Sequence, residues 1–226
     1  SPSPPVPRLR SCGGVGRAVE IQDGVLGAGP LLVIANHSSH LDMGLVKYAL
    51  GEQGERMASR LKGMFAFAIF DRPRNRVVLA RDRFGIKPLF WASHQGQWIF
   101  ASEMKAILAL QGFRPELDRQ ACYDFLGLSY IPEPATGFAN IFALEKGTTL
   151  VLDEQGSHSA TFARVTLPAS SGATRSELAE RTGELLSEAV GRQSVADVPV
   201  AALLSGGIDS AVVLPVNCSR VATSAV

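Results

Sequence analysis

Gly63-Met-Phe-Ala-Phe-Ala-Ile-Phe-Asp71 decides the fold of the central part of this chain. Phe65, Phe67 and Ile69 alternate with residues that are equally apolar, and successive side chains of a strand point to opposite faces. A strand that is apolar on both faces is covered on both faces, so it belongs in the middle of its sheet. The polar residues that follow predict a turn, and 76–81 predicts the returning antiparallel strand.

Further short elements of the same kind follow along the chain. Apolar and β-branched runs predict strands, and a polar residue before an amphipathic run predicts a capped helix. The expected elements are a hairpin of 88–93 and 97–101 around His94-Gln95-Gly96, a helix from Glu103 to Leu110 capped by Ser102, a helix from Arg119 to Leu128 capped by Asp118, and a strand at 150–153. The pattern predicts an α+β fold.

A second motif, Leu204-Ser-Gly-Gly-Ile-Asp-Ser210, ends the apolar run 198–204. That run predicts a strand buried on both faces of a parallel sheet, and Gly206 and Gly207 allow the backbone to approach a ligand. A helix beginning near Ile208 presents unpaired N–H groups, which favour a phosphate. Asp209 would repel a bare phosphate, so the motif predicts Mg²⁺ between the two. A plain glycine turn capped by Asp209 and Ser210 explains the motif equally well.

The same stretch resembles the pyrophosphate loop of the N-type ATP pyrophosphatases, and the preceding Asp197-Val-Pro-Val narrows the resemblance to the asparagine synthetases. Ala211 departs from this pattern, because a second serine usually stands there. The resemblance implies ATP and Mg²⁺ as cofactors, with Asp209 beside the metal. It assigns ATP binding to Leu204, Ser205, Gly206, Gly207, Ile208, Asp209 and Ser210.

Five ordered motifs extend this resemblance to the class II glutamine amidotransferases over about residues 59–213. They are Gly63–Asp71, Arg81–Phe90, Ala101–Ala106, Tyr130–Gly137 and Leu144–Gly147. The resemblance implies a partial antiparallel αββα-type glutaminase-like sheet, followed by the first strand, loop and helix of an α/β ATP-pyrophosphatase domain. In such proteins one domain hydrolyses glutamine, and the other uses ATP to adenylate aspartate, which the released ammonia attacks.

An amphipathic helix, with Leu178, Leu185 and Ala189 on one face, is expected to lie against the strand leading to Ser205. Arg81, Asp82 and Arg83 are expected to tie turns together by ion pairs and not to touch substrate.

The chain is expected to have five parts. They are a disordered or weakly ordered leader (1–28), an acyltransferase-like fragment (29–58), the C-terminal half of an amidotransferase domain (59–167), a linker (168–175) and the start of the ATP-pyrophosphatase domain (176–226).

His37 and Asp42 suggest a different chemistry. They follow the apolar run 31–35, and Asp42 could orient His37 as general base for a hydroxyl nucleophile. The stretch resembles the H-x-x-x-x-D motif of glycerolipid acyltransferases, which makes acyl transfer a second hypothesis. A helix start capped by Ser39 or Asp42 is the structural alternative.

The glutaminase nucleophile of the resembled family is a cysteine whose own α-amino group acts as base, so it stands first in the mature chain. Here Ser1 is the first residue, and Cys12-Gly13-Gly14 is only a faint match to a family start. We therefore expect this truncated chain alone not to catalyse amide formation. A related amidotransferase acting on another carboxylate, and a non-catalytic binding module, remain alternatives.

Composition narrows the class of partner. The chain has 226 residues, 46% of them hydrophobic, and a net charge of +1, which gives no basic footprint for nucleic acid. No apolar run is long enough to span a bilayer. Cys12, Cys122 and Cys218 are too scattered for a disulfide framework or a zinc site and are expected to be free thiols. Composition thus favours the cytoplasm and no nucleic acid, and the resemblance implies glutamine, aspartate and ATP as partners, with a homodimer left open.

Overall fold

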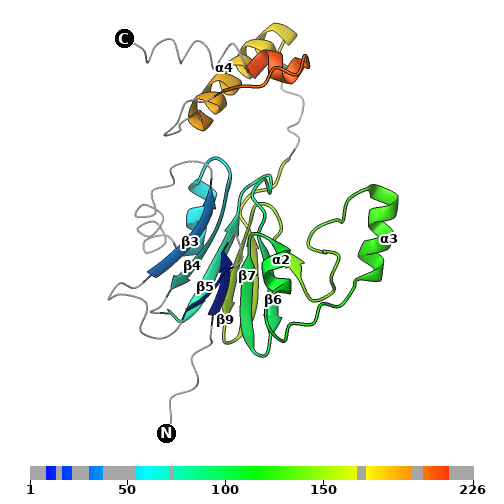
Figure 1. The fold of residues 1–226 in the computed structure, drawn as a ribbon. Helices are drawn as coiled ribbons and strands as arrows, with labels where there is room; N and C mark the ends of the chain where they lie inside the picture. Colours follow the sequence, from blue (N-terminus) through cyan, green and yellow to red (C-terminus); the bar gives the residue numbers. More distant parts are fainter. Residues whose placement is uncertain are drawn as a thin grey trace. The chain divides into compact units, whose positions relative to one another are not determined.

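The computed structural model describes residues 9–13, 17–21, 31–37, 54–71, 74–166, 172–194 and 201–213 (Figure 1). The chain divides into two compact units, Ser1–Val165 and Thr166–Val226. Unit 1 holds two five-stranded sheets, and the described part of unit 2 is helical with one loop. None of the helices that the structure describes is long and apolar enough to cross a membrane.

The first sheet of unit 1, the β4 sheet, has the strand order β10-β9-β5-β4-β3, and every neighbouring pair is antiparallel. β4 and β5 pair with Asp71 opposite Arg76, so 76–81 is the returning antiparallel strand that the sequence predicts. Its strands are β3 (Leu31–His37), β4 (Phe65–Asp71), β5 (Arg76–Arg81), β9 (Thr148–Asp153) and β10 (Gly156–Thr161).

The central position predicted for β4 is confirmed. All seven of its residues are buried, and it lies between β3 and β5. Phe65, Phe67 and Ile69 pack on one face with Met57 of the 3₁₀ helix η1 (Gly54–Arg60), while Ala66, Ala68 and Phe70 pack on the opposite face. The alternation read from the sequence therefore corresponds to two separate apolar layers.

The second sheet, the β7 sheet, has the order β2-β1-β7-β6-β8. The β6–β7 hairpin closes through Gln95 and Gly96, which both have positive φ, as a two-residue hairpin turn requires. Its strands are β1 (Leu9–Gly13), β2 (Arg17–Ile21), β6 (Phe90–His94), β7 (Gln97–Ala101) and β8 (Phe142–Ala143).

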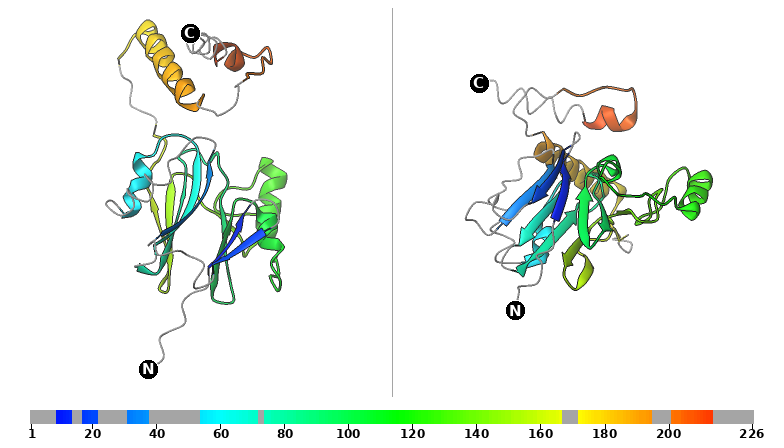
Figure 2. Two further views of the ribbon diagram at one scale, coloured as in Figure 1. Left: turned by 60° about the vertical axis from the view of Figure 1, so that its left-hand side comes forward. Right: turned by 60° about the horizontal axis from the view of Figure 1, so that its bottom comes forward.

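Unit 1 has the layered αββα arrangement that the resemblance implies. The two sheets lie face to face (Figure 2). Leu89 and Phe100, which belong to the β7 sheet or its flanking chain, pack with Leu79 and Leu150 of the β4 sheet in one shared core. Trp98 Nε1 also donates a hydrogen bond to the carbonyl of Asp153 across this layer, at 3.2 Å. The outer face of the β7 sheet is covered by α2 (Met104–Leu108), and that of the β4 sheet by η1.

Of the two predicted helix caps, one is present in the structure and the other is absent. Asp118 caps α3 (Arg119–Leu128) as predicted, because its carboxylate accepts from the amide of Ala121 at 3.0 Å. The prediction for α2 was wrong in its bounds and in its cap. The helix spans only Met104–Leu108, its N-cap is Glu103, and no side chain caps it, since Ser102 stands one residue too early to reach the first free amides.

Two strands lie within the segment 1–28, for which a disordered or weakly ordered leader is predicted. β1 lies parallel to β7, with Arg10 opposite Ile99, and β2 pairs with β1 in an antiparallel ladder. The strand predicted at 18–21 is present as β2, whereas β1 was missed. Its pairing depends on the open edge of β7, which is distant in sequence and leaves no local pattern.

Unit 2 contains α4 (Arg175–Gln193), followed by the loop and short helix of 201–213. Thr174 and Glu177 form a reciprocal capping box at the start of α4. The strand predicted over 198–204 is wrong for the described residues 201–204, which have no regular structure, and Leu203 is 95% exposed. α4 buries no residue, so its predicted packing against that strand is also wrong. A strand buried on both faces needs neighbouring strands, and the described part of unit 2 has none.

Candidate functional site

The loop Ser205–Ser210 is the predicted phosphate-binding site, and its local geometry agrees with a glycine turn. Gly206 has φ +80°, a backbone conformation that favours glycine. The hydroxyls of Ser205 and Ser210 lie 3.0 Å apart, and Ser210 Oγ donates to the carbonyl of Gly207, also at 3.0 Å. The two serines that flank the glycines are thus brought together on one side of the loop.

The backbone amides of this loop are available to a ligand. Gly207 N–H has a long contact of 3.4 Å to Ser205 Oγ, and the amides of Gly206, Ile208 and Asp209 have no hydrogen-bond partner among the residues that the structure describes. Residues 201–209 are exposed, so no protein group of unit 2 that is described covers these amides. The arrangement fits the donor set that a phosphate needs.

Asp209 is the only acidic residue of the loop, and it is exposed. Within the described ranges, no group of three or more His, Cys, Asp or Glu side chains is placed to hold a metal ion. Mg²⁺ usually keeps several waters and takes one or two carboxylates together with substrate phosphates. A single carboxylate beside the predicted phosphate-binding loop is compatible with Mg²⁺ that binds together with a nucleotide.

Arg81 at the end of β5 holds together the loops at one end of unit 1. Its guanidinium donates to the carbonyls of Lys87, Gly85 and Leu144 at 2.8, 2.7 and 2.6 Å, and pairs with Glu133 Oε1 at 2.7 Å. Its side chain is 10% exposed. The expected structural role of Arg81 is therefore visible in its contacts, although three of its four partners are carbonyl oxygens.

Asp82 binds backbone amides where ion pairs were expected. Its carboxylate accepts from the N–H groups of Phe65 (3.3 Å), Phe84 (3.0 Å), Ile86 (3.2 Å) and Lys87 (3.0 Å), and the residue is 1% exposed. Such charge-assisted bonds fix the 82–87 loop against the start of β4. The loop is thus a rigid wall of unit 1.

Gly147 joins this wall to the segment that follows β10. Its φ is +63°, its N–H donates to Asp82 O at 2.8 Å, and its carbonyl accepts from Phe162 and Ala163 at 2.8 and 3.2 Å. A Cβ at this position would lie 2.3 Å from the carbonyl oxygen of Ala163. Only glycine therefore allows this close approach of two backbones.

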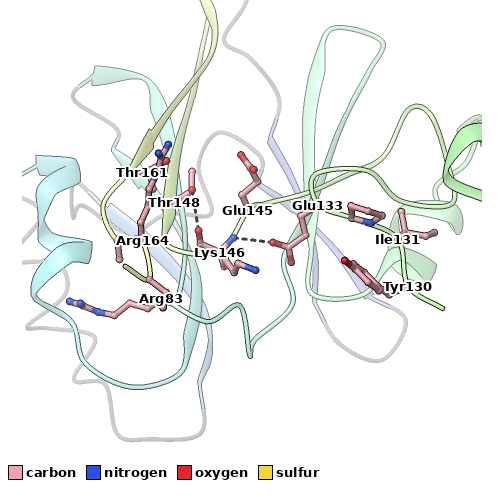
Figure 3. Close-up of a pocket in the computed structure, with 12 residues that line it drawn as sticks. Arg83, Tyr130, Ile131, Glu133, Glu145, Lys146, Thr148, Thr161 and Arg164 are labelled. Carbon is pink, nitrogen blue, oxygen red and sulfur yellow. Dashed lines mark hydrogen bonds between the residues drawn. The ribbon is translucent and has the colours of Figure 1, made fainter. Parts of the chain in front are cut away.

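A cavity of about 710 Å³ opens beside this junction, and all of its lining residues belong to unit 1 (Figure 3). Figure 3 shows Lys146 between Glu133 on one side and Thr148 on the other, with Tyr130 and Ile131 beyond Glu133. The backbone N–H of Lys146 donates to Glu133 Oε2 at 3.2 Å. Arg83 donates to the carbonyl of Ser59 at 2.5 Å, so its guanidinium is directed toward η1.

The alternative catalytic pair lies only partly within the described residues. His37 is the last residue of β3, and Asp42 lies outside the described residues. β3 pairs along its whole length with β4, from Leu31 opposite Asp71 to His37 opposite Phe65, so this segment is a strand of the β4 sheet. Of the three cysteines, Cys122 is a free thiol on α3, as predicted.

Two family models match this chain in consecutive segments. The glutamine amidotransferase domain matches residues 34–163, and asparagine synthase matches residues 181–216. The first match covers more than half of the chain and includes most of β3, which does not favour the acyltransferase hypothesis. The chain belongs to the glutamine amidotransferase family.

The particular relatives are asparagine synthetases. Asparagine synthetase [glutamine-hydrolyzing] 3 of Bacillus subtilis is 34% identical over 163 residues, which are 72% of this chain and 26% of that protein. Asparagine synthetase [glutamine-hydrolyzing] 1 of the same organism is 33% identical over 165 residues, again 72% and 26%. The chain thus spans about a quarter of the length of the curated relatives it matches.

Among solved structures, the glutamine phosphoribosylpyrophosphate amidotransferase of B. subtilis, complexed with ADP and GMP, matches 84% of this chain and 44% of its own. The TM-score is 0.38 and the sequence identity is 16%. The family assignment rests on the sequence matches.

The cavity was missed by the sequence reasoning. Its residues come from four segments, near 83, 130–133, 145–148 and 161–165, and no spacing rule connects them. Tyr130–Gly137 and Leu144–Gly147 were both singled out as family motifs, and the structure shows that they meet at Glu133 and Lys146. The sequence did contain one indication of a site, because both of these motifs hold charged residues to which no role had been assigned.

Proposed function

We propose that this chain takes part in glutamine-dependent asparagine synthesis, in which ammonia from glutamine is added to aspartate that ATP has activated. The observation that carries the proposal is the order of the two family matches, an amidotransferase domain at 34–163 followed by asparagine synthase at 181–216. Glutamine, aspartate and ATP are the substrates under this proposal. The reaction takes place in the cytoplasm, where ATP is available and a thiol such as that of Cys122 stays reduced.

The loop 204–210 has a defined part in this proposal. The amides of Gly206, Ile208 and Asp209 donate to the diphosphate oxygens of ATP, and the hydroxyls of Ser205 and Ser210 add two neutral donors on the same side. The two hydroxyls lie 3.0 Å apart, and each would turn its proton from its present acceptor toward the phosphate. Leu204 leads the chain into this turn.

Asp209 contributes to Mg²⁺ binding, since its exposed carboxylate is available to a cation that also contacts the phosphates. Bound Mg²⁺ would neutralise charge on the diphosphate that leaves when aspartate is adenylated. Without the metal, the Asp209 carboxylate repels the nucleotide. ATP binding should therefore depend on Mg²⁺ more strongly in the original chain than in Asp209→Asn.

Equilibrium dialysis of radiolabelled ATP against the 226-residue chain, with and without Mg²⁺, tests this proposal. We expect saturable binding with Mg²⁺, about tenfold weaker binding in a Ser205→Ala, Ser210→Ala double variant, and weaker Mg²⁺-dependent binding in Asp209→Asn. Glu180→Gln on α4 removes an exposed acidic charge from the same unit and serves as the matched control. Equal affinities in all four chains would refute the assignment of this loop.

The acceptor is tested separately. Release of pyrophosphate from Mg·ATP is measured with aspartate and, in parallel, with glutamate or a simple monocarboxylate. The chain alone is expected to release none, and release in any of these mixtures would refute that expectation. Stimulation by aspartate alone supports asparagine synthesis. Stimulation by another carboxylate would assign the chain to a related amidotransferase.

A further inference from the structure

Within the described part of the chain, the lining of the cavity beside Lys146 has more unpaired cationic side chains than unpaired carboxylates. Arg83, Lys146 and Arg164 supply three cationic side chains to the lining, and Glu133 and Glu145 supply two carboxylates. The ammonium of Lys146 and the guanidinium of Arg164 have no hydrogen-bond or ion-pair partner among the residues that the structure describes. A solute that enters the cavity therefore meets unpaired cations.

One of the two carboxylates is already neutralised. Glu133 Oε1 pairs with the buried guanidinium of Arg81 at 2.7 Å, and Oε2 accepts the backbone N–H of Lys146 at 3.2 Å. Both oxygens are thus engaged, and only Glu145 remains as an uncompensated acid in the lining. The resulting local charge favours an anion.

The walls of the cavity are fixed before any ligand arrives. Arg81 and Asp82 hold the loops of 82–87 and 144–146 by the hydrogen bonds described above, and Gly147 holds the 162–163 segment at 2.8 and 3.2 Å. Rigid walls reduce the ordering cost of binding. The volume of about 710 Å³ lies within the range of small-molecule sites, roughly 300–1,000 Å³.

The lining also has an apolar side. Ile131 and Pro132 follow Tyr130, whose side chain is exposed, and Ala163 and Val165 are further apolar residues of the lining. Figure 3 places Tyr130 and Ile131 on the Glu133 side of Lys146, and Thr161 and Arg164 on the other. A purely inorganic ion would leave this apolar surface in contact with water.

We propose that this cavity binds a small organic anion, with its phosphate or carboxylate group near Lys146 and Arg164 and its apolar part near Ile131. Hydroxyls of Thr148 and Thr161 are further donors in the lining. None of these residues belongs to the 204–210 loop, so the proposal does not depend on the proposed ATP contact.

The test uses the full chain in EDTA, without Mg²⁺, with backbone amide chemical shifts as the readout. The probes are phenyl phosphate and benzoate, which carry the two charged groups on the same ring, with benzyl alcohol as the neutral counterpart. We expect saturable shifts at Lys146, Gly147 and Ala163 with at least one anion, none with the alcohol, and weaker binding at high salt. Whichever anion binds identifies the charged group.

Two variants test the cations directly. Lys146→Gln and Arg164→Gln should each weaken binding of that anion about tenfold, whereas Arg114→Gln, which removes an exposed charge outside the cavity, should leave it unchanged. The amide spectra of the variants in the absence of probe show whether each chain remains folded. The proposal is overturned if neither anion gives saturable shifts, if the alcohol binds equally well, or if the shifts occur only at 205–210. The last result would instead support the phosphate loop alone.

Discussion

Replacing Gly147 by alanine tests the account of how unit 1 is held together. The substitution forces a side chain onto a residue with φ +63°, which costs about 1–2 kcal/mol. It also places a Cβ 2.3 Å from the carbonyl oxygen of Ala163, so the 162–163 segment must move by more than half an ångström. That movement weakens two hydrogen bonds to the Gly147 carbonyl, each worth about 1 kcal/mol net. The expected loss in the free energy of unfolding is about 3–4 kcal/mol.

Gly96→Ala is the matched control. Gly96 also has a positive φ, +72°, but a Cβ there meets nothing within 4 Å, so only the backbone cost of about 1–2 kcal/mol remains. Urea unfolding followed by tryptophan fluorescence measures both, because the two tryptophans of the chain, Trp91 and Trp98, pack against the core between the sheets. The dependence on urea should be the same in each chain if only stability has changed.

The comparison between the two variants decides the outcome. The account requires Gly147→Ala to be about 2 kcal/mol more destabilising than Gly96→Ala, through the clash and the weakened hydrogen bonds. If the two losses are equal, the 147–163 contact does not hold the segment in place. The fixed wall of the cavity would then lose its main support.

Three further predictions concern Arg81, the core and the cap of α4. Arg81→Met leaves Glu133 and three backbone carbonyls without their buried donor, so it should lower the free energy of unfolding in urea by about 3–5 kcal/mol. Arg83→Met loses one hydrogen bond and should lower it by under about 1 kcal/mol; similar losses would show that Arg81 does not hold these loops together. Phe67→Ala, at a side chain 2% exposed, should cost about 3–5 kcal/mol, and a loss below about 1 kcal/mol would contradict the central place of β4. The pKa of Glu177 is lowered by the hydrogen bond from the backbone N–H of Thr174 and, to a smaller extent, by the one from its hydroxyl. The ionised cap therefore stabilises α4 fully above the ordinary pKa of glutamate, about 4.3. This stabilisation is lost as the pH falls through the lowered pKa. Circular dichroism should show less helix in Glu177→Gln than in the original chain at pH 7 and no difference at pH 2; an equal helix content at pH 7 would contradict it.

The β4 sheet could be predicted from sequence because its signal is local. Alternation over Phe65–Phe70 identifies both faces of β4, and the polar turn before Arg76 fixes the register of β5. The cap at Asp118 was predictable for the same reason, since its acceptor and donor are three residues apart. β1 was not predictable, because in the described structure it pairs with β2 and with the distant edge of β7.

The apolar run before Ser205 shows a strand that was predicted but is absent from the described residues. Its apolar composition is typical of a buried strand, but a strand of a parallel sheet exists only when its neighbours supply hydrogen bonds. Described residues of unit 2 supply none, and Leu203 and Leu204 are exposed. The predicted burial was therefore wrong for the described residues, because the partner strands it requires lie outside what a local pattern can specify.

Of the candidate sites, the loop 204–210 was predictable because its glycines, serines and aspartate are contiguous. The ligand contacts assigned to them remain predictions that the dialysis experiment tests. The cavity was not predictable, because Arg83, Glu133, Lys146 and Arg164 come together only through the Arg81 and Gly147 contacts. Charged residues in separate motifs indicate that the motifs matter, but not that they meet.

The central claim is that the amides just after Leu204 receive the diphosphate of ATP. Its most direct measurement is the change in backbone amide chemical shifts when Mg·pyrophosphate is added to the isotopically labelled 226-residue chain. The account predicts saturable downfield shifts at Gly206, Ile208 and Asp209, because these N–H groups would acquire acceptors they now lack. Unchanged positions of these three signals, at pyrophosphate concentrations that shift other amides to saturation, would contradict it.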